Sequence, residues 1–396
     1  MLFRSFTLMK KKQTGTFVGT LRMNPRGFGF VIAEDQEQFP EDAFIAKHLT
    51  GSAIDGDLVE VEILPKSKKD KGPEGKILSV LERGRSHLGG IVRFIEQNNY
   101  FIFSPLLGPN KPMRCLAHEE PLEPGDRVIA KVVDWGGQNQ PILCEVTQVL
   151  GHIDDASIDT KAAAEEFQIA NAFPEEVIKQ AKAYGKSVSK KECANRADFT
   201  QMECLTIDPT TAKDFDDALT LRKDEKGQYH LGVHIADVAH YVKPGTPLDI
   251  EAIRRSNSTY FPGACIPMLP EELSNNLCSL KEKVVRFCVS VLMTFSKSGK
   301  LIHHEIKRSF IKSAKRFTYE EAMLVLDGKK KSKYKPSLEL MVELCLLLKQ
   351  QRSARGTIDF SLPEVVLDMA PTGEPLSYHI VEYDITHQMV EEFMLK

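Results

Sequence analysis

Residues 206–219 read TIDPTTAKDFDDAL and contain four aspartates, Asp208, Asp214, Asp216 and Asp217. An apolar strand is expected to end at Asp208, a Pro-Thr turn follows, and a second strand resumes at Ala218, so the four carboxylates are predicted to meet on one loop. Crowded like charges raise one another's pKa unless a cation neutralises them. An all-oxygen ligand set without His or Cys suits a hard cation, so the loop predicts a Mg²⁺ site, with Mn²⁺ as the alternative ion.

Such a site has a defined chemistry. Two Mg²⁺ ions about 4 Å apart can activate a water molecule and stabilise the leaving oxygen in phosphodiester hydrolysis. The same residues also fit a solvated acidic turn, or a calcium loop that only supports structure. The acids alone leave these alternatives open.

Upstream of this loop, residues 15–84 are rich in short strands separated by turn signals, and five strands in about 70 residues predict a small β-barrel of the OB or cold-shock type. The segment GFGFV places Phe28 and Phe30 two residues apart, on one face of a strand, and Phe44 in DAFIAK can add a third ring. Aromatic rings beside basic groups form a stacking platform for single-stranded nucleic acid. The alternative is that one or two of these rings only fill the barrel. The segment resembles a cold-shock domain, whose two RNA-binding motifs GFGFV and DAFIAK match.

A weaker second copy follows at an offset of 69 residues, because the Gly-Asp pairs at 56–57 and 125–126 share that spacing. We therefore expect a leader at 1–13, barrels at 14–87 and 88–152, and a helical linker at 153–200. Residues 201–396 mix strands and helices, as in an α+β domain. The expected fold class is thus a multidomain chain of two OB/cold-shock-like barrels, a helical spacer and an α+β catalytic domain.

The aspartate segment, continued by LGVHIADVAHYV at 231–242, resembles the catalytic-domain signature of the ribonuclease II and ribonuclease R family of processive 3′→5′ exoribonucleases. The tandem barrels favour the ribonuclease R branch. The resemblance implies that the four aspartates form the catalytic, metal-binding site, and that Tyr260 and Phe360 stack on the terminal bases of single-stranded RNA. His234, Asp237 and His240 are interpreted as structural groups rather than metal ligands.

The resemblance also indicates that residue 396 falls midway through the family's catalytic domain. The catalytic domain is therefore expected to be incomplete at its C-terminal end, with a separately encoded C-terminal half as a candidate partner. Two hypotheses follow. The chain is a Mg²⁺-dependent hydrolytic exoribonuclease that releases nucleoside 5′-monophosphates, or it is a catalytically impaired RNA-binding fragment of such an enzyme.

The amino-acid composition limits the class of protein to which the chain can belong. The 396 residues are 42% hydrophobic and 27% charged, with a net charge of −3, as in ordinary globular proteins. No apolar run approaches the ~20 residues that cross a bilayer, so no membrane partner is expected. Eight cysteines are scattered without a CxxC pair, which predicts reduced thiols in a cytoplasmic protein.

Overall fold

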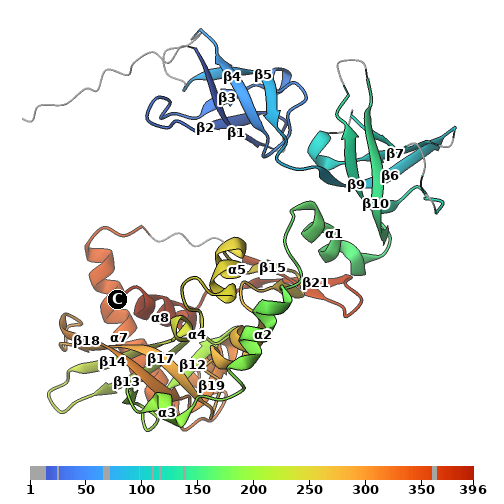
Figure 1. Cartoon of the computed structure of the whole chain (residues 1–396). Coiled ribbons are helices and arrows are strands. Elements are labelled where there is room, and N and C mark those ends of the chain that lie inside the picture. The colour runs from blue at the N-terminus through green and yellow to red at the C-terminus, as the bar shows by residue number, and fades with distance from the viewer. Residues whose placement is uncertain are drawn as a thin grey trace, which may run out of the picture. The chain divides into compact units, whose positions relative to one another are not determined.

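The computed structural model describes residues 15–24, 26–65, 72–97, 99–108, 111–115, 118, 120–136, 140–358 and 364–396 (Figure 1). These residues divide into two compact units, which we call the N-terminal unit and the C-terminal unit. The N-terminal unit comprises Met1–Ile169 together with Thr372–Glu374, and the C-terminal unit comprises Ala170–Pro371 and Pro375–Lys396.

The first half of the N-terminal unit is a closed five-stranded barrel with the strand order β1-β2-β3-β5-β4. Its strands are β1 (Thr16–Met23), β2 (Gly29–Ala33), β3 (Ala43–Ile45), β4 (Leu58–Ile63) and β5 (Glu74–Glu82). Burial alternates along β1 to β4, because successive side chains point into and out of the barrel. Closure leaves no open edge, which is how so small a sheet protects its backbone groups.

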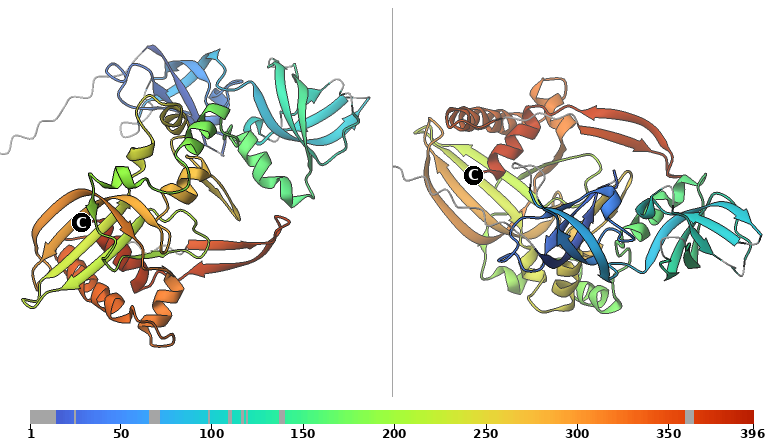
Figure 2. Two further views of the ribbon diagram at one scale, coloured as in Figure 1. Left: turned by 60° about the horizontal axis from the view of Figure 1, so that its bottom comes forward. Right: turned by 90° about the horizontal axis from the view of Figure 1, so that it is seen from above.

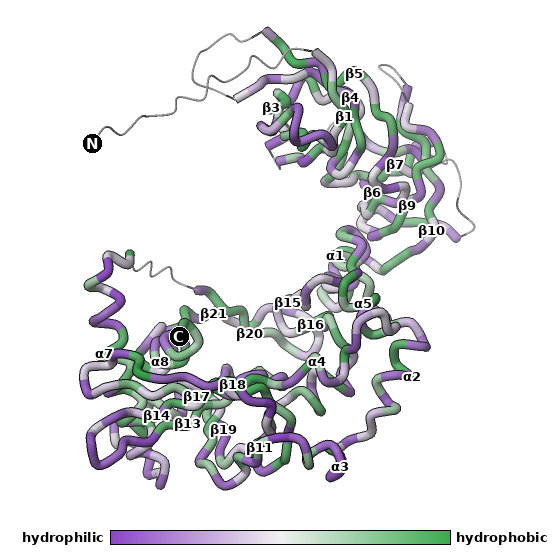
Figure 3. Tube along the Cα trace, turned by 60° about the vertical axis from the view of Figure 1, so that its left-hand side comes forward, coloured by the Kyte–Doolittle hydropathy of each residue, from purple (hydrophilic) through white to green (hydrophobic). Residues whose placement is uncertain are grey.

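The second half repeats this design as a closed barrel in the order β10-β8-β7-β6-β9. Its strands are β6 (His87–Glu96), β7 (Asn99–Phe103), β8 (Met113–Cys115), β9 (Asp126–Asp134) and β10 (Ile142–His152). The predicted repeat is confirmed at its turns, since Gly56 and Gly125 both adopt a positive φ, 90° and 103°, a conformation that favours glycine. In Figure 3 hydrophobic and hydrophilic residues follow one another along both sets of strands.

The segment between the barrels and the large sheet contains three short helices, α1 (Asp159–Glu166), α2 (Glu175–Ala183) and α3 (Lys190–Cys193). The boundary between the two units falls within it, so α1 belongs to the N-terminal unit and α2 and α3 to the C-terminal unit.

A seven-stranded mixed sheet organises the C-terminal unit, in the order β11-β18-β17-β14-β13-β12-β19 (Figure 2). The strands are β11 (Ala197–Asp198), β12 (Leu205–Asp208), β13 (Asp217–Lys223), β14 (Tyr229–Ala236), β17 (Val285–Phe295), β18 (Leu301–Lys312) and β19 (Lys315–Thr318). One face of the sheet packs against α6 (Tyr319–Leu326), α7 (Lys335–Ala354) and α8 (Ile385–Met394) in the largest apolar core of the described residues.

The remaining elements lie around this sheet. They are α4 (Val238–Tyr241), α5 (Pro247–Arg255), the hairpins β15 (Thr259–Phe261) with β16 (Ala264–Ile266) and β20 (Glu364–Met369) with β21 (Pro375–Val381), and a π-helical turn at Leu273–Leu277. The expected class of two barrels followed by an α+β domain is confirmed. Within the described residues, no helix is long and apolar enough to cross a membrane.

Candidate active site

The four aspartates lie at one end of two neighbouring strands. Asp208 is the last residue of β12, and Asp217 is the first residue of β13. Asp214 and Asp216 lie on the connection between them, and we call residues 208–217 the acidic loop. The backbone carbonyl of Asp216 accepts a hydrogen bond of 2.8 Å from Ala236 N, so the end of the loop is fixed to β14.

The carboxylates destabilise one another's charged forms. Burial, followed by the charge on Asp217, raises the pKa of Asp208 to about 7. Burial and then the charge on Asp216 raise the pKa of Asp217 to about 6. Burial also raises the pKa of Asp216, with a further contribution from Asp214. Asp208, Asp216 and Asp217 therefore form one electrostatic group, which we call the acidic group. The charge on Asp214 acts on this group through Asp216.

Arg316 holds one side of the acidic loop. Its guanidinium donates to the backbone carbonyl oxygens of Pro209, at 2.7 Å, and Thr210, at 3.2 Å. It also lies 5.2 Å from the centre of the Phe215 ring, a cation–π distance. A loop that concentrates repelling charges needs such restraints, because repulsion alone would open it.

The chemistry of these residues fits a divalent cation. Within the part of the chain that the structure describes, the buried Oδ2 of Asp208 has no hydrogen-bond partner, and all the candidate metal ligands are hard oxygen atoms. Among the described residues, however, no group of three or more His, Cys, Asp or Glu side chains is arranged to hold a metal ion. Mg²⁺ usually takes one or two carboxylates and completes its shell with water and substrate phosphates, so binding of this ion does not require an all-protein cage.

Tyr260 lies beside this group, on β15. Its side chain is 69% exposed. Partial burial and then the nearby charge of Asp214 raise the pKa of Tyr260, which places the phenol near the acidic loop. The exposed ring is available for stacking on a base. Phe360, the second predicted stacking residue, lies outside the described residues.

Tyr319 is a site residue that the sequence analysis missed. Strands β12 and β19 run parallel with Asp208 opposite Thr318, so Tyr319 follows directly beside the acids. Burial and then the charges of the acidic group, Asp208 first, raise the pKa of Tyr319 to about 12. Its ring stacks on His387 of α8, with centroids 3.9 Å apart and planes at 14°.

The histidines and the acid downstream of the loop make structural contacts. His234 is fully buried between Thr220 and Ser290, and burial lowers its pKa to about 4, which keeps it neutral. Asp237 forms a 2.6 Å ion pair with Arg196. His240 lies 3.1 Å from Glu192. All three thus have protein partners, as their interpretation as structural groups requires.

The aromatic residues predicted on the first barrel gather on one surface, which we call the barrel 1 face. Cα partners run from Arg22 through Phe30 to Phe44 across β1, β2 and β3. The ring centroids of Phe28, Phe30 and Phe44 are 5.6 to 6.0 Å apart, and Phe30 is 42% exposed. The rings are therefore a surface cluster rather than barrel filling.

The second barrel carries a related surface. Here the Cα partners run from Phe94 through Phe101 to Arg114 across β6, β7 and β8. The rings of Phe94 and Phe101 stack with centroids 4.5 Å apart. These two rings come from different strands, β6 and β7, so no spacing within one strand marks the pair in the sequence.

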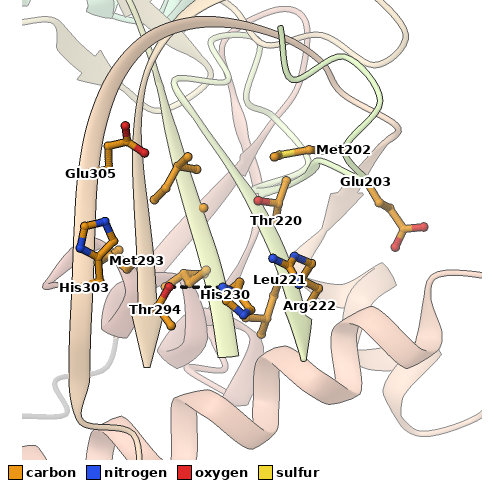
Figure 4. Close-up of a pocket in the computed structure, with 13 residues that line it drawn as sticks. Met202, Glu203, Thr220, Leu221, Arg222, His230, Met293, Thr294, His303 and Glu305 are labelled. Atoms are coloured by element: carbon orange, nitrogen blue, oxygen red, sulfur yellow. Dashed lines mark hydrogen bonds between the residues drawn. The ribbon is translucent and has the colours of Figure 1, made fainter. Parts of the chain in front are cut away.

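A cavity of about 350 Å³ in the C-terminal unit is separate from the acids. Figure 4 shows Thr220 and Arg222 of β13, His230 of β14 and the β18 residues His303 and Glu305 around it. None of the four aspartates lines it. The cavity is therefore not the predicted catalytic site.

Comparison with protein families identifies three regions. Residues 196–396 match the RNB domain, residues 19–80 the ribonuclease B OB domain, and residues 116–174 a cold shock domain. The RNB match covers about half of the chain and contains all four aspartates.

Curated and solved relatives agree with these matches. Ribonuclease R of Chlamydia pneumoniae is 39% identical over 386 residues, which are 96% of this chain and 57% of that protein. Two structures of Mycoplasma genitalium RNase R resemble the fold: the apo form, with a TM-score of 0.83 and 30% identity, and a complex with ribose methylated single-stranded RNA, with 0.84 and 29%. Each match covers 95% of this chain and 60% of the Mycoplasma chain. The chain thus spans somewhat more than half the length of these relatives.

Proposed function

Because this chain belongs to the RNB-domain family that includes ribonuclease R, we propose that it degrades single-stranded RNA by hydrolysis from the 3′ end, with Mg²⁺, and releases nucleoside 5′-monophosphates. The observation that carries the proposal is the acidic group, in which burial and then neighbouring carboxylates raise the pKa of Asp208 and Asp217 at the end of two strands. A bound cation would relieve this repulsion.

The four aspartates are proposed to have different roles in the site. Asp208 and Asp217 would hold Mg²⁺, because β12 ends at Asp208 and β13 begins at Asp217, on either side of the connection. Asp214 and Asp216 would add negative charge from the loop and orient the attacking water. Bound Mg²⁺ would lower the pKa of that water and stabilise charge on the phosphate oxygens. Mn²⁺ can take the same oxygen ligands.

The substrate class is proposed from two aromatic surfaces. Tyr260 offers an exposed ring beside Asp214, and by the family resemblance Phe360 would supply a second ring. A duplex end cannot enter between two stacked rings, whereas an unpaired base can. The barrel 1 face would bind the strand further from its end, since base stacking tolerates any sequence.

The direct experiment uses the whole purified chain with a single-stranded RNA labelled at its 5′ end. With Mg²⁺ we expect progressive shortening from the 3′ end, and with a chelator none. Asp216→Asn should stop the shortening while RNA binding persists. Glu225→Gln, the same charge change at an exposed residue of a turn, is the matched control. A fully active Asp216→Asn variant would show that the acidic loop is not the catalytic site.

The second candidate function is an RNA-binding module without catalysis. It is favoured by the absence, among the described residues, of three or more His, Cys, Asp or Glu side chains arranged to hold a metal ion. Its signature is salt-dependent binding of single-stranded RNA without degradation at any Mg²⁺ concentration. Shortening that appears only after addition of a polypeptide carrying the rest of the family's catalytic domain would instead support a separately encoded C-terminal half.

The cytoplasm remains our proposed location. No disulfide joins the cysteines of the described residues, and most of these cysteines are buried. This agrees with reduced thiols in a reducing compartment.

A further inference from the structure

A buried hydroxyl also holds the acidic loop, close to its C-terminal end. Ser279 is fully buried, and its Oγ donates to the backbone carbonyl of Lys213 at 2.8 Å. The same oxygen accepts from the backbone N–H of Phe215 at 3.1 Å. These two bonds bracket Asp214 and lie directly before Asp216.

The backbone next to Ser279 adds a third bond to the loop. Leu280 N donates to the carbonyl oxygen of Phe215 at 2.7 Å. Both backbone polar groups of Phe215 therefore form hydrogen bonds with the 279–280 segment.

Ser279 is itself held by an unusual buried cation. Arg286 of β17 is 2% exposed, and its Nε donates to the carbonyls of Ser279, at 3.1 Å, and Asn276, at 2.8 Å. One terminal nitrogen, Nη2, donates to Asn276 Oδ1 at 2.8 Å. Its hydrogen-bond partners in the described chain are carbonyl oxygens rather than carboxylates, and burial lowers its pKa.

Burial of a charge without a counter-ion destabilises the folded state. The use of Arg286 to hold this turn therefore lowers the stability of the fold. The turn it fixes is also irregular, because Leu273–Leu277 form a π-helical turn with both leucines fully buried. Single π-turns are frequent at functional sites. Two costly features thus converge on the segment that binds the acidic loop.

We infer that Ser279 is a positioning residue for the acidic loop and that Arg286 holds Ser279 in place. Repulsion among the carboxylates pushes the loop open, and the two hydrogen bonds of the hydroxyl oppose that repulsion at Asp214 and Asp216. Ser279 acts through the loop backbone and does not contact the metal or the RNA itself. The inference deepens the proposed function and rests on it for its catalytic consequence.

The test compares Ser279→Ala with Ser279→Thr, which keeps a hydroxyl. Ser309→Ala is the matched control, because Ser309 is also fully buried and makes two hydrogen bonds elsewhere in the sheet, to Ser290 and to the carbonyl of Cys288. Arg286→Lys keeps the charge but loses the fork that reaches Ser279 and Asn276 together. All variants are made in the whole chain.

Two readouts do not need RNA cleavage. Mn²⁺ affinity, measured by electron paramagnetic resonance, should fall about tenfold or more in Ser279→Ala, as for residues that support metal ligands from behind. Hydrogen exchange of the Phe215 amide should become faster. Ser279→Thr should restore both values toward the parent, Arg286→Lys should shift both in the direction of Ser279→Ala, and Ser309→Ala should change neither.

In the cleavage assay, Ser279→Ala should lower kcat and leave KM for RNA unchanged. Parent-like Mn²⁺ affinity and amide exchange in Ser279→Ala, or equal losses in Ser309→Ala, would overturn the inference. If the parent binds Mn²⁺ but cleaves no RNA, the proposed function fails while these two readouts still decide the role of Ser279. If the parent takes up no Mn²⁺, the exchange of the Phe215 amide alone decides it.

Discussion

The acidic loop and the barrel 1 face are both assigned to RNA, yet they are built in opposite ways. In the C-terminal unit, the buried Asp208 and the half-buried Asp217 raise the energy of the charged group at the end of two strands. In the N-terminal unit, neutral rings lie on the surface, and Phe30 is 42% exposed. The acidic loop destabilises the fold until a cation binds. The barrel 1 face needs little restraint, because base stacking tolerates variation in geometry.

This difference between the two regions predicts which property a substitution in each region should alter. Substitutions in the acidic loop should alter metal binding, catalysis and pH dependence, and should leave RNA affinity nearly unchanged. Substitutions on the barrel 1 face should alter RNA affinity and leave metal binding unchanged. Each prediction below tests this separation, beginning with the largest expected effect.

Asp208→Asn should abolish cleavage and at the same time stabilise the metal-free fold. We expect a rate loss of about a thousandfold or more, because one metal ligand is lost. In the metal-free protein at pH 8, removal of a buried repelling charge should raise the free energy of unfolding by on the order of 2 kcal/mol. Cleavage rates and urea unfolding measure the two effects, and a destabilised variant would contradict the electrostatic account.

The stability of the metal-free chain should decrease as the pH rises. The folded-state pKa values of Asp208, about 7, and Asp217, about 6, lie above the ordinary 3.8. Both groups therefore favour the fold fully below about pH 4, and this contribution is lost as the pH rises through 6 and 7. Saturating Mg²⁺ should reverse the loss by about 2 to 3 kcal/mol at pH 8, and by much less at pH 5. Thermal unfolding with and without Mg²⁺ measures the difference, and equal shifts at both pH values would argue against the acidic group as the binding site.

Tyr260→Ala should weaken capture of the RNA 3′ end about tenfold, since one stacked base contributes roughly 1 to 3 kcal/mol. Metal affinity should stay at the parent value, because the ring supplies no ligand. Tyr260→Phe, which keeps the ring, is the matched control. Binding of an RNA whose 3′ end is free, compared with one whose 3′ end is paired, provides the measurement. Equal losses in both variants would show that the hydroxyl rather than the ring is used.

Phe30→Ala should reduce affinity for single-stranded RNA about fivefold, because its neighbours Phe28 and Phe44 remain available for stacking. Cleavage at saturating RNA should be unchanged. Leu81→Ala, at another exposed apolar residue of the same barrel, should leave affinity unchanged. Fluorescence anisotropy with a labelled RNA measures both variants, and equal losses would indicate a general effect on the barrel.

The sequence predicted most reliably what is local. Short strands separated by turn signals indicated the first barrel, and the repeat at an offset of 69 residues indicated the second. The four aspartates were found because they lie within ten residues. The glycine-spaced phenylalanines were likewise visible as a surface feature.

The residues that were missed come together only through the tertiary fold. Tyr319 reaches the acids because β19 pairs in parallel with β12, about a hundred residues earlier in the chain. Ser279 reaches Lys213 across 66 residues. No periodicity or motif spacing marks either contact, since the register of distant strands and turns is decided by packing. Phe360 and the metal assignment stay predictions.

The central claim is that the acidic loop binds a divalent cation, and titration of the whole metal-free chain with Mn²⁺, followed by electron paramagnetic resonance, tests it most directly. We predict saturable uptake at pH 8, weaker uptake at pH 5.5, and loss of uptake in a variant that combines Asp208→Asn with Asp217→Asn. No uptake by the folded parent, or unchanged uptake by the double variant, would contradict the account.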